Sequence, residues 1–372
     1  AQYWGKQDRE NIRKVMAFVL RNTCLIALMF CLGAILVPDV LMRIFTNDAE
    51  LVRLGARYLE VVGISYLLSG ITQIYLCILK NIGHAGKSML ISSVTVVLNL
   101  LLNAVLIFGV GRVPALGIAG AALATVLANT AGLVWAVLES FRKDGLCPAK
   151  AYLRPRVSKL EKRFWKYTMP VMANGLFWGG GFTMYSVVMG HLGTDAVAAN
   201  SIANITKSLV ICFCLGLGNA GSILVGNALG AGDLERAKKE GAYLCKLSII
   251  SGILTGAFLL VVSPAILSLV HIGPRAQVYL RYMLIVSSYY VAGKSVNCMT
   301  IGGIFCAGGD SRFGMYCDAV TLWCITVPLG MIAAFIWKAP VPVVYFLLNL
   351  DEIVKLPVVY RHYKKYHWVR NL

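Results

Sequence analysis

The chain carries a long internal repeat. Its opening, Ala1–Glu10, returns with changes as Gly226–Glu235, and later landmarks such as Pro38 and Pro264 recur at nearly the same separation. That separation stays between 224 and 226 residues. A repeat of this length in an apolar chain is typical of membrane transporters built from two similar halves around a central site.

The two copies differ in their upstream sequence. About 65 apolar residues precede Gly226, whereas nothing precedes Ala1. A membrane helix needs about 20 residues, so the difference corresponds to two helices with their loops. We therefore expect ten of twelve transmembrane helices here, with the first two absent. A ten-helix protein is the alternative, although half a repeat would leave polar helix faces against lipid.

The composition predicts an all-α, polytopic membrane protein. The chain is 58% hydrophobic and only 14% charged, against about 25% charged residues in soluble proteins. Apolar runs long enough to span a membrane predict ten helices. They lie near residues 14–42, 52–79, 88–110, 116–140, 164–190, 196–225, 240–270, 277–305, 313–337 and 340–360.

The distribution of Lys and Arg predicts the orientation. Loops on the side of residues 5–14 carry 24 of them, including five in 355–372, and the opposite side carries seven. By the positive-inside rule the first side is cytoplasmic, in the inner or plasma membrane. The net charge of +18 is then mostly this bias. Contact with membrane lipid explains it better than nucleic-acid binding, which we do not expect.

Four domains follow from these patterns. Residues 1–141 form the remaining four helices of an N-terminal lobe, and 142–163 form a basic cytoplasmic linker with two prolines. Residues 164–361 form a six-helix C-terminal lobe. Residues 362–372 form a cytoplasmic tail.

The sequence argues against an enzyme. No metal site is expected, because no His, Asp and Glu cluster has suitable spacing and all five His residues lie at or beyond the ends of spans. No G-x-x-x-x-G-K-[ST] motif for ATP is present. Gly216–Gly221 spells G-x-G-x-x-G, but it lies in an apolar span without a preceding strand, so we interpret it as close helix packing.

Several motifs in order resemble the multidrug and toxic compound extrusion family of antiporters, usually called MATE. Gln2-x-x-Gly5-x-x-Asp8 and Gly226–Asp233 are similar to its paired loops after the second helix of each lobe. Further stretches are similar to its tenth, eleventh and twelfth helices: Cys306–Phe313, Asp318-x4-Trp323-x4-Pro328, and Asp351–Lys355. The resemblance implies twelve helices in two lobes, a central cavity, and export driven by a proton or sodium gradient.

One departure from the family concerns its coupling acids. Members use acidic residues in the first helix, and some use one in the seventh. The first helix is absent here, and Pro170–Trp178 in the seventh has no carboxylate. The coupling acid is therefore expected in the missing segment or elsewhere.

Polar residues inside spans are the candidate site residues, because each charge there costs at least about 2.5 kcal/mol and needs a partner or a task. Polar stripes on three helices of one lobe predict a shared aqueous cavity. Interhelical hydrogen bonding is the alternative for each asparagine, and a structural hydrogen bond is the alternative for the aspartate. The candidates are Asn174, Trp178, Tyr185, Asn200, Asn204, Lys207, Tyr290, Lys294, Asn297 and Asp318, with Asn99 and Asn103 for the first lobe.

Two hypotheses follow for Lys207 and Lys294. With Asp318 as the only nearby carboxylate, the two lysines would favour substrates that bear an acidic group. Alternatively, a desolvated lysine would itself bind and release the coupling proton. Asp351, Glu352 and Lys355 are interpreted as a local ion-pair cluster near the end of the last span.

The resulting prediction is a secondary antiporter that exports small organic molecules or drugs in exchange for H⁺ or Na⁺. It needs no cofactor beyond the coupling ion, binds a small-molecule substrate, and is expected to be a monomer. A flippase for lipid-linked saccharides is one alternative, because it would use basic residues in its cavity. A non-transporting receptor or scaffold is the other.

Overall fold

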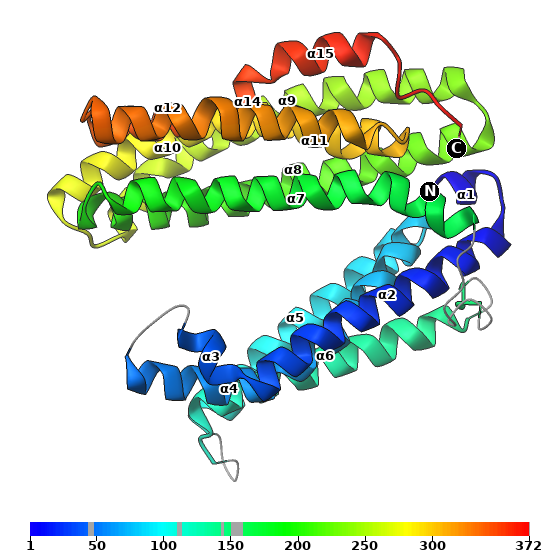
Figure 1. Ribbon diagram of the computed structural model, residues 1–372, viewed down its shortest axis with the longest axis horizontal. Coiled ribbons are helices and arrows are strands. Elements are labelled where there is room, and N and C mark those ends of the chain that lie inside the picture. The colour runs from blue at the N-terminus through cyan, green and yellow to red at the C-terminus, as the bar shows by residue number, and fades with distance from the viewer. Residues whose placement is uncertain (44–47, 110–113, 143–144, 150–158, 372) are drawn as a thin grey trace. The chain divides into compact units, whose positions relative to one another are not determined.

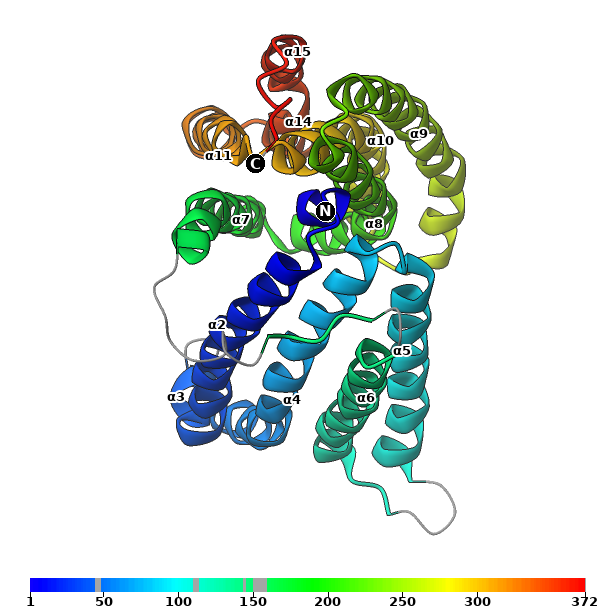
Figure 2. The same ribbon diagram turned by 90° about the vertical axis from the view of Figure 1, so that its right-hand side faces the viewer.

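The computed structural model describes residues 1–43, 48–109, 114–142, 145–149 and 159–371, and all regular structure in these ranges is helical (Figures 1 and 2). The predicted all-α class is confirmed. Two compact units divide the chain: a first unit, Asp8–Glu161, and a second unit, Ala1–Gln7 with Lys162–Leu372. Much of the predicted basic linker, at 143–144 and 150–158, lies outside the described residues.

The first unit has four long helices and one short helix. Aspartates begin two of the long ones: Asp8 accepts a hydrogen bond from the backbone of Asn11, and Asp48 accepts one from the backbone of Glu50. The prediction of a single helix over 14–42 is wrong at its end, because Pro38 begins a separate helix. The helices are α2 (Arg9–Leu36), α3 (Pro38–Arg43), α4 (Ala49–Asn81), α5 (Ala85–Phe108) and α6 (Gly117–Ser140).

Small residues hold α6 against α5. A side chain on Gly120 would run into the backbone carbonyl of Leu106, and one on Gly132 would meet Thr95. Ala124 on the same helix is fully buried. Because lipid tails are as apolar as the helices, this close backbone approach, rather than a hydrophobic drive, stabilises the pair.

The second unit contains the two longest helices of the described chain, of 38 and 36 residues. Its α8 lies between Gly193 and Gly232, and Gly232 caps its C-terminus with a φ of 82°, the left-handed conformation that glycine adopts readily. The elements are α1 (Gln2–Gly5), α7 (Lys159–Gly190), α8 (Thr194–Ala231), α9 (Leu234–Leu269), α10 (Pro274–Asn297) with its π-helical continuation η2 (Cys298–Phe305), α11 (Ser311–Ala319), η3 (Val320–Thr326), α12 (Val327–Met331), η4 (Ile332–Ile336), α13 (Val341–Leu348), α14 (Asp351–Val354) and α15 (Leu356–Lys364).

The two copies of the repeated motif pack against each other in this unit. A side chain on Gly5 would collide with the backbone carbonyl of Asn227 in α8, and one on Gly230 would collide with the carbonyl of Gln2 in α1. Gly5 and Gly230 are equivalent positions of the repeat, as are Gln2 and Asn227. The contact is therefore self-complementary, with each glycine lying on the backbone of the other copy.

The last described residues fold back onto the second unit. Trp368 is fully buried, and its indole N–H donates to the carbonyl of Tyr363 at 3.2 Å. The amide of Gln2 donates both to the carbonyl of Ala307 at 2.7 Å and to that of Arg370 at 3.2 Å. Trp368, with Val369 packed beside it, thus contributes to the core of this unit.

The final predicted span, 340–360, is not one helix. It breaks after Leu348, forms the single turn α14, and breaks again at Lys355 before α15. In the described chain, seven helices are long and apolar enough to cross a membrane by length and composition alone. The other three predicted spans, 164–190, 277–305 and 340–360, are helical without meeting that criterion.

Candidate functional site

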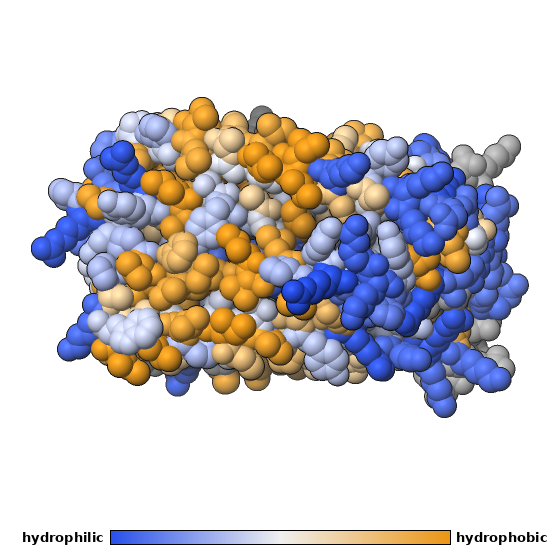
Figure 3. Space-filling view, turned by 90° about the horizontal axis from the view of Figure 1, so that it is seen from above, coloured by the Kyte–Doolittle hydropathy of each residue, from blue (hydrophilic) through white to orange (hydrophobic). Residues whose placement is uncertain are grey.

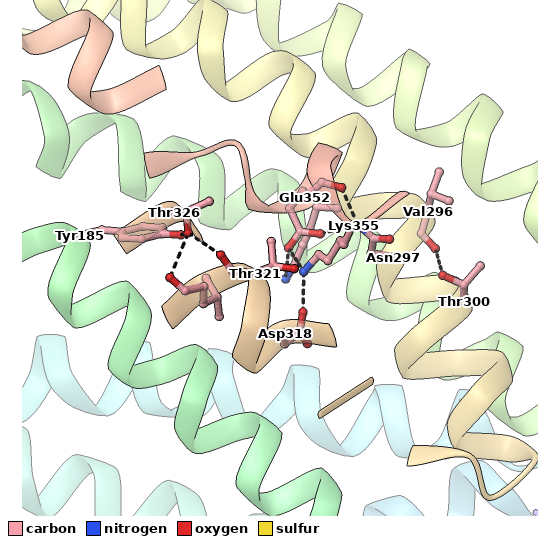
Figure 4. Close-up of polar contacts among 11 residues, drawn as sticks. Tyr185, Val296, Asn297, Thr300, Asp318, Thr321, Thr326, Glu352 and Lys355 are labelled. Carbon is pink, nitrogen blue, oxygen red and sulfur yellow. Dashed lines mark hydrogen bonds and ion pairs between the residues drawn. The ribbon is translucent and has the colours of Figure 1, made fainter. Parts of the chain in front are cut away.

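A buried network of charges lies inside the second unit (Figure 4). Glu352 of α14 accepts from Lys294 of α10 at 2.9 Å and forms an ion pair with Lys355 at 3.1 Å. Lys355 also donates to Asp318 of α11 at 2.6 Å. All four side chains are buried, so the network ties three helical segments together inside the membrane-spanning region.

Neutral groups complete the environment of Glu352. The amide of Asn297 donates to the Oε2 atom of Glu352 at 2.7 Å and to its backbone carbonyl at 2.8 Å. The ammonium group of Lys294 lies 4.8 Å from the ring centre of Trp178, within the range of a cation–π interaction. Each carboxylate oxygen of Glu352 therefore has a donor, as a buried charge requires.

The broken last span makes this network possible. The one-turn α14 places Asp351 and Glu352 in consecutive buried positions, and the break at Lys355 lets that lysine reach both carboxylates. Gly293 of α10 provides the space, because a side chain there would lie 3.2 Å from the Cβ of Glu352. Irregular backbone of this kind is tolerated at membrane depth where protein buries it.

Lys207 occupies a second, adjoining environment. Its ammonium group donates to the side-chain oxygen of Asn349 at 2.9 Å. Three aromatic rings lie around it, Tyr290 at 4.6 Å, Tyr345 at 5.6 Å and Phe182 at 5.8 Å. No carboxylate in the described part of the chain lies within ion-pairing distance of Lys207. Its charge is held by one amide oxygen and by ring faces.

Asp351 is the exception in the network. The residue is 1% exposed, and neither carboxylate oxygen has a hydrogen-bond partner among the described residues. An ionised carboxylate without a donor is costly in a buried site, whereas one that carries a proton or binds a cation is not.

The charges of the site balance. Three ammonium groups (Lys207, Lys294 and Lys355) accompany three carboxyl groups (Asp318, Asp351 and Glu352). If all six are ionised, the sum is zero. Removing one partner of such a buried pair typically costs about 3–5 kcal/mol, because the other charge is left uncompensated.

The sequence-predicted residues fall into separate groups. Lys294, Asn297, Asp318 and Trp178 lie in the charge network, and Lys207 contacts Tyr290. The hydroxyl of Tyr185 instead lies 2.8 Å from that of Thr326, beside the network in Figure 4.

The remaining asparagines are elsewhere. Asn200 is buried and Asn204 half-buried on α8, and the side-chain oxygen of Asn174 is buried without a partner among the described residues. Asn99 and Asn103 belong to the first unit, where Asn103 donates to Asn99 at 3.0 Å and Asn99 donates to Thr125 at 3.3 Å.

Sequence reasoning missed the carboxylates that matter most. The expectation that Asp318 is the only carboxylate near the lysines is wrong, because Glu352 contacts Lys294 directly and Asp351 is the neighbour of Glu352. Lys355, counted among the cytoplasmic basic residues, is buried instead. A usable signal was Pro357, which lies at the start of α15 and marks a break in the last span.

Long apolar helices in two units, with ion pairs buried inside one of them, define a polytopic membrane protein of the transporter type. The MatE family model matches residues 1–105 and 170–332. The chain belongs to this family, whose members are transporters and not enzymes. It is accordingly a multi-pass protein of the inner or plasma membrane.

Named relatives are distant but match over long stretches. The probable multidrug resistance protein NorM of Mannheimia succiniciproducens is 25% identical over 312 residues, which are 80% of this chain and 66% of the relative. The probable multidrug resistance protein YoeA of Bacillus subtilis is 24% identical over 369 residues, 98% of this chain and 79% of the relative. The chain thus spans about two thirds to four fifths of these relatives.

Solved structures support the fold. An outward-facing multidrug resistance MATE family transporter of the MOP superfamily gives a TM-score of 0.86 at 18% identity, covering 98% of this chain and 80% of that one. A MOP superfamily transporter from Pyrococcus furiosus gives 0.87 at 18% identity, covering 98% and 81%.

Proposed function

We propose that this protein is a secondary antiporter that exports small organic molecules and that Asp351 takes up the coupling cation. The observation that carries the proposal is the buried Asp351 carboxyl group, whose two oxygens have no donor among the described residues. It lies beside a network in which every other carboxylate is paired. A group in this position gains from binding a positive charge, which is what a coupling site must do.

A proton suits the site better than sodium. A metal cation needs several oxygen ligands at once. The ammonium groups of Lys294 and Lys355 already occupy the neighbouring carboxylates. A proton needs only one oxygen of Asp351.

The charge balance gives a mechanism for exchange. With Asp351 ionised the six groups sum to zero, and with Asp351 protonated they sum to +1. The protonated state therefore disfavours a second cation in its surroundings, and the ionised state admits one. Proton entry would then expel an organic cation, because a ligand shifts the conformational balance by its differential affinity for the two states.

This proposal replaces both lysine hypotheses. A preference for acidic cargo assumed an excess of lysine charge, which Asp351 and Glu352 remove. Lys294 is a poor proton donor, because its ammonium form is held by Glu352 at 2.9 Å. The relatives named as probable multidrug resistance proteins support organic, drug-like cargo.

The test uses purified protein in liposomes with a fluorescent organic cation as cargo. Two modes are compared: exchange of cargo at equal concentrations on both sides, and accumulation driven by an imposed proton or sodium gradient. Asp351→Asn fixes the charge of the protonated state, so we expect it to exchange cargo with weakened affinity at every pH and to lose proton-driven accumulation. The matched control is Asp39→Asn, since Asp39 is exposed on α3, and it should retain both.

Each other outcome has a definite meaning. Accumulation driven only by sodium would refute the proton assignment. Proton-driven accumulation that survives in Asp351→Asn would refute the role of Asp351. If the wild-type protein exchanges cargo but follows neither gradient, antiport itself is wrong, and lipid-linked saccharides become the cargo to try. A receptor or scaffold would show no exchange at all.

A further inference from the structure

An apolar groove runs along the outer side of the second unit, on the opposite side of Gly293 from Glu352. Its volume is about 500 Å³, within the roughly 300–1,000 Å³ typical of sites that hold a drug-sized ligand. One wall is a stripe of α9, and the other is a stripe of α14 and α15. The lining residues include Cys245, Ile249 and Ile253 on the first wall, and Leu356, Tyr360 and Tyr363 on the second.

The groove opens toward lipid. Ile253 and Tyr360 on its two walls are each 61% exposed on the outer surface of the unit. Figure 3 looks onto the face that carries α9 and α15, where apolar side chains gather over the middle and hydrophilic ones gather toward one end. In a membrane, such an opening meets acyl chains.

Two ammonium groups lie next to the groove. Lys364 lies 5.5 Å from the ring centre of Tyr360, which lines the groove. Lys238 of α9 lies 5.6 Å from the ring of Tyr366. That ring is 6.2 Å from the ring of Tyr363, another lining residue. Each wall therefore has a lysine near the groove. Lys364 contacts a lining tyrosine directly, and Lys238 contacts one through the ring of Tyr366.

These lysines are available to a ligand. Lys364 has no carboxylate within ion-pairing distance in the part of the chain that the structure describes. Lys238 pairs with Glu235 at 2.7 Å, but Glu235 is 75% exposed, and such surface pairs are weak. Both lysines lie on the side of the protein with the excess of basic residues, which faces the leaflet rich in anionic lipid.

We propose that this groove binds one anionic phospholipid of the bilayer, with an acyl chain in the slot and the phosphate between Lys238 and Lys364. The apolar lining alone does not select a ligand in a membrane, because lipid tails are as apolar as the groove. The two lysines select an anionic headgroup, and basic pockets between membrane helices on the cytoplasmic side bind such headgroups.

The position of the groove gives this lipid a structural task. Gly293 and Ile353 also line it, and Gly293 is the residue against which Glu352 packs from the other side. An acyl chain in the groove would therefore cover the outer side of the one-turn α14. It would hold α14 and α15 against α10.

The experiment measures phospholipid retained by the purified full-length protein, by mass spectrometry after extraction with a mild detergent from a membrane of mixed phosphatidylglycerol and phosphatidylcholine. We expect about one phosphatidylglycerol per protein. The double variant Lys238→Gln with Lys364→Gln should weaken its binding about fivefold for each lysine removed. Val296 lies in the last turn of α10 and lines the groove. Val296→Trp fills the groove and should abolish lipid binding.

The matched control is Lys239→Gln with Lys365→Gln, which removes the same charge from adjacent exposed positions on α9 and directly after α15. It should retain the lipid. Equal loss in this control would mean non-specific attraction to the basic surface and would overturn the proposal. Retention in Val296→Trp, or equal retention of phosphatidylcholine by the wild-type protein, would overturn it as well.

Discussion

The two copies of the repeat share a scaffold but differ in where they keep their charges. In the second unit the ion pairs of Lys294, Lys355, Asp318 and Glu352 are buried between helical segments. In the first unit Lys87 and Arg142 pair with Glu139 near the ends of α5 and α6, at 2.7 and 3.4 Å. Lys14 pairs with Glu10 in the first turns of α2, and Arg21 of α2 pairs with Glu161 of α7.

The equivalent positions of the first copy are all uncharged. At an offset of 225 residues, Lys294, Asp318, Asp351, Glu352 and Lys355 correspond to Ser69, Ser93, Val126, Leu127 and Thr130. No offset between 224 and 226 brings a charged residue to any of these places. The equivalent of α13–α15 is α6, an unbroken helix of 24 residues. Duplication therefore supplied a scaffold that tolerates both versions, and the buried network is a property of one copy.

The largest expected effect is the removal of Glu352. Glu352→Gln leaves the buried ammonium of Lys294 without its only carboxylate partner among the described residues, so we expect the free energy of unfolding to fall by about 3–5 kcal/mol. Glu139→Gln in the first unit should cost less, because Lys87 and Arg142 are 40% and 71% exposed and can return to water. Thermal unfolding in detergent measures both. Equal losses would contradict the contrast between the units.

The self-complementary glycine contact should show symmetric effects. Gly5→Ala and Gly230→Ala each force a methyl group into a backbone carbonyl of the other copy, at a cost of about 1–3 kcal/mol for overpacking. Gly216→Ala is the control, since nothing lies within 4 Å of its would-be Cβ. The measurement is the midpoint of thermal unfolding for the three variants. A large effect at only one of the two glycines would break the symmetry.

Lys207 should be less critical for stability than Lys294. Lys207→Met removes an ammonium held by Asn349 and aromatic rings, a loss of about 1–2 kcal/mol. Lys294→Met removes an ion-pair partner of the buried Glu352 and should lower the free energy of unfolding by more. Chemical unfolding of both variants compares them directly. If Lys207→Met lowers the free energy of unfolding more than Lys294→Met does, the charge of Lys207 interacts strongly with Asp351, although the two residues form no ion pair.

The smallest effect is expected in the first unit. Asn103→Leu removes one hydrogen bond to Asn99 on the same helix α5, and such a pair four residues apart is worth about 0.2–0.5 kcal/mol. Transport should be unchanged. Liposome assays that show lost transport with normal stability would instead assign Asn103 to a substrate path.

The fold was largely predictable, because apolar length and an internal repeat are properties of the chain itself. Lys294 and Asp318 could also be predicted as site residues, since a charge in an apolar span is costly wherever it falls. Their ion-pair partners could not be predicted. Lys294 and Glu352 are 58 residues apart, and the spacing of Glu352 and Lys355 already satisfied a local pair in a continuous helix.

The missing information was the break in the last span. Leu348, Asn349 and Leu350 contain no glycine or proline to mark the first break. Only Pro357 marked the second. Tertiary contacts with α10 and α11, rather than local propensity, decide where this segment stops being helical.

The segment α13–α15 has a consequence for how the protein is made. It carries Asp351, Glu352 and Lys355, and each charge costs roughly 2.5–3.5 kcal/mol when a helix enters the bilayer alone. Its partners Lys294 and Asp318 precede it in the sequence, so they are synthesised first. The segment can therefore enter the membrane against ready-made counter-charges, and its insertion becomes the step at which biogenesis of this half of the protein either completes or fails.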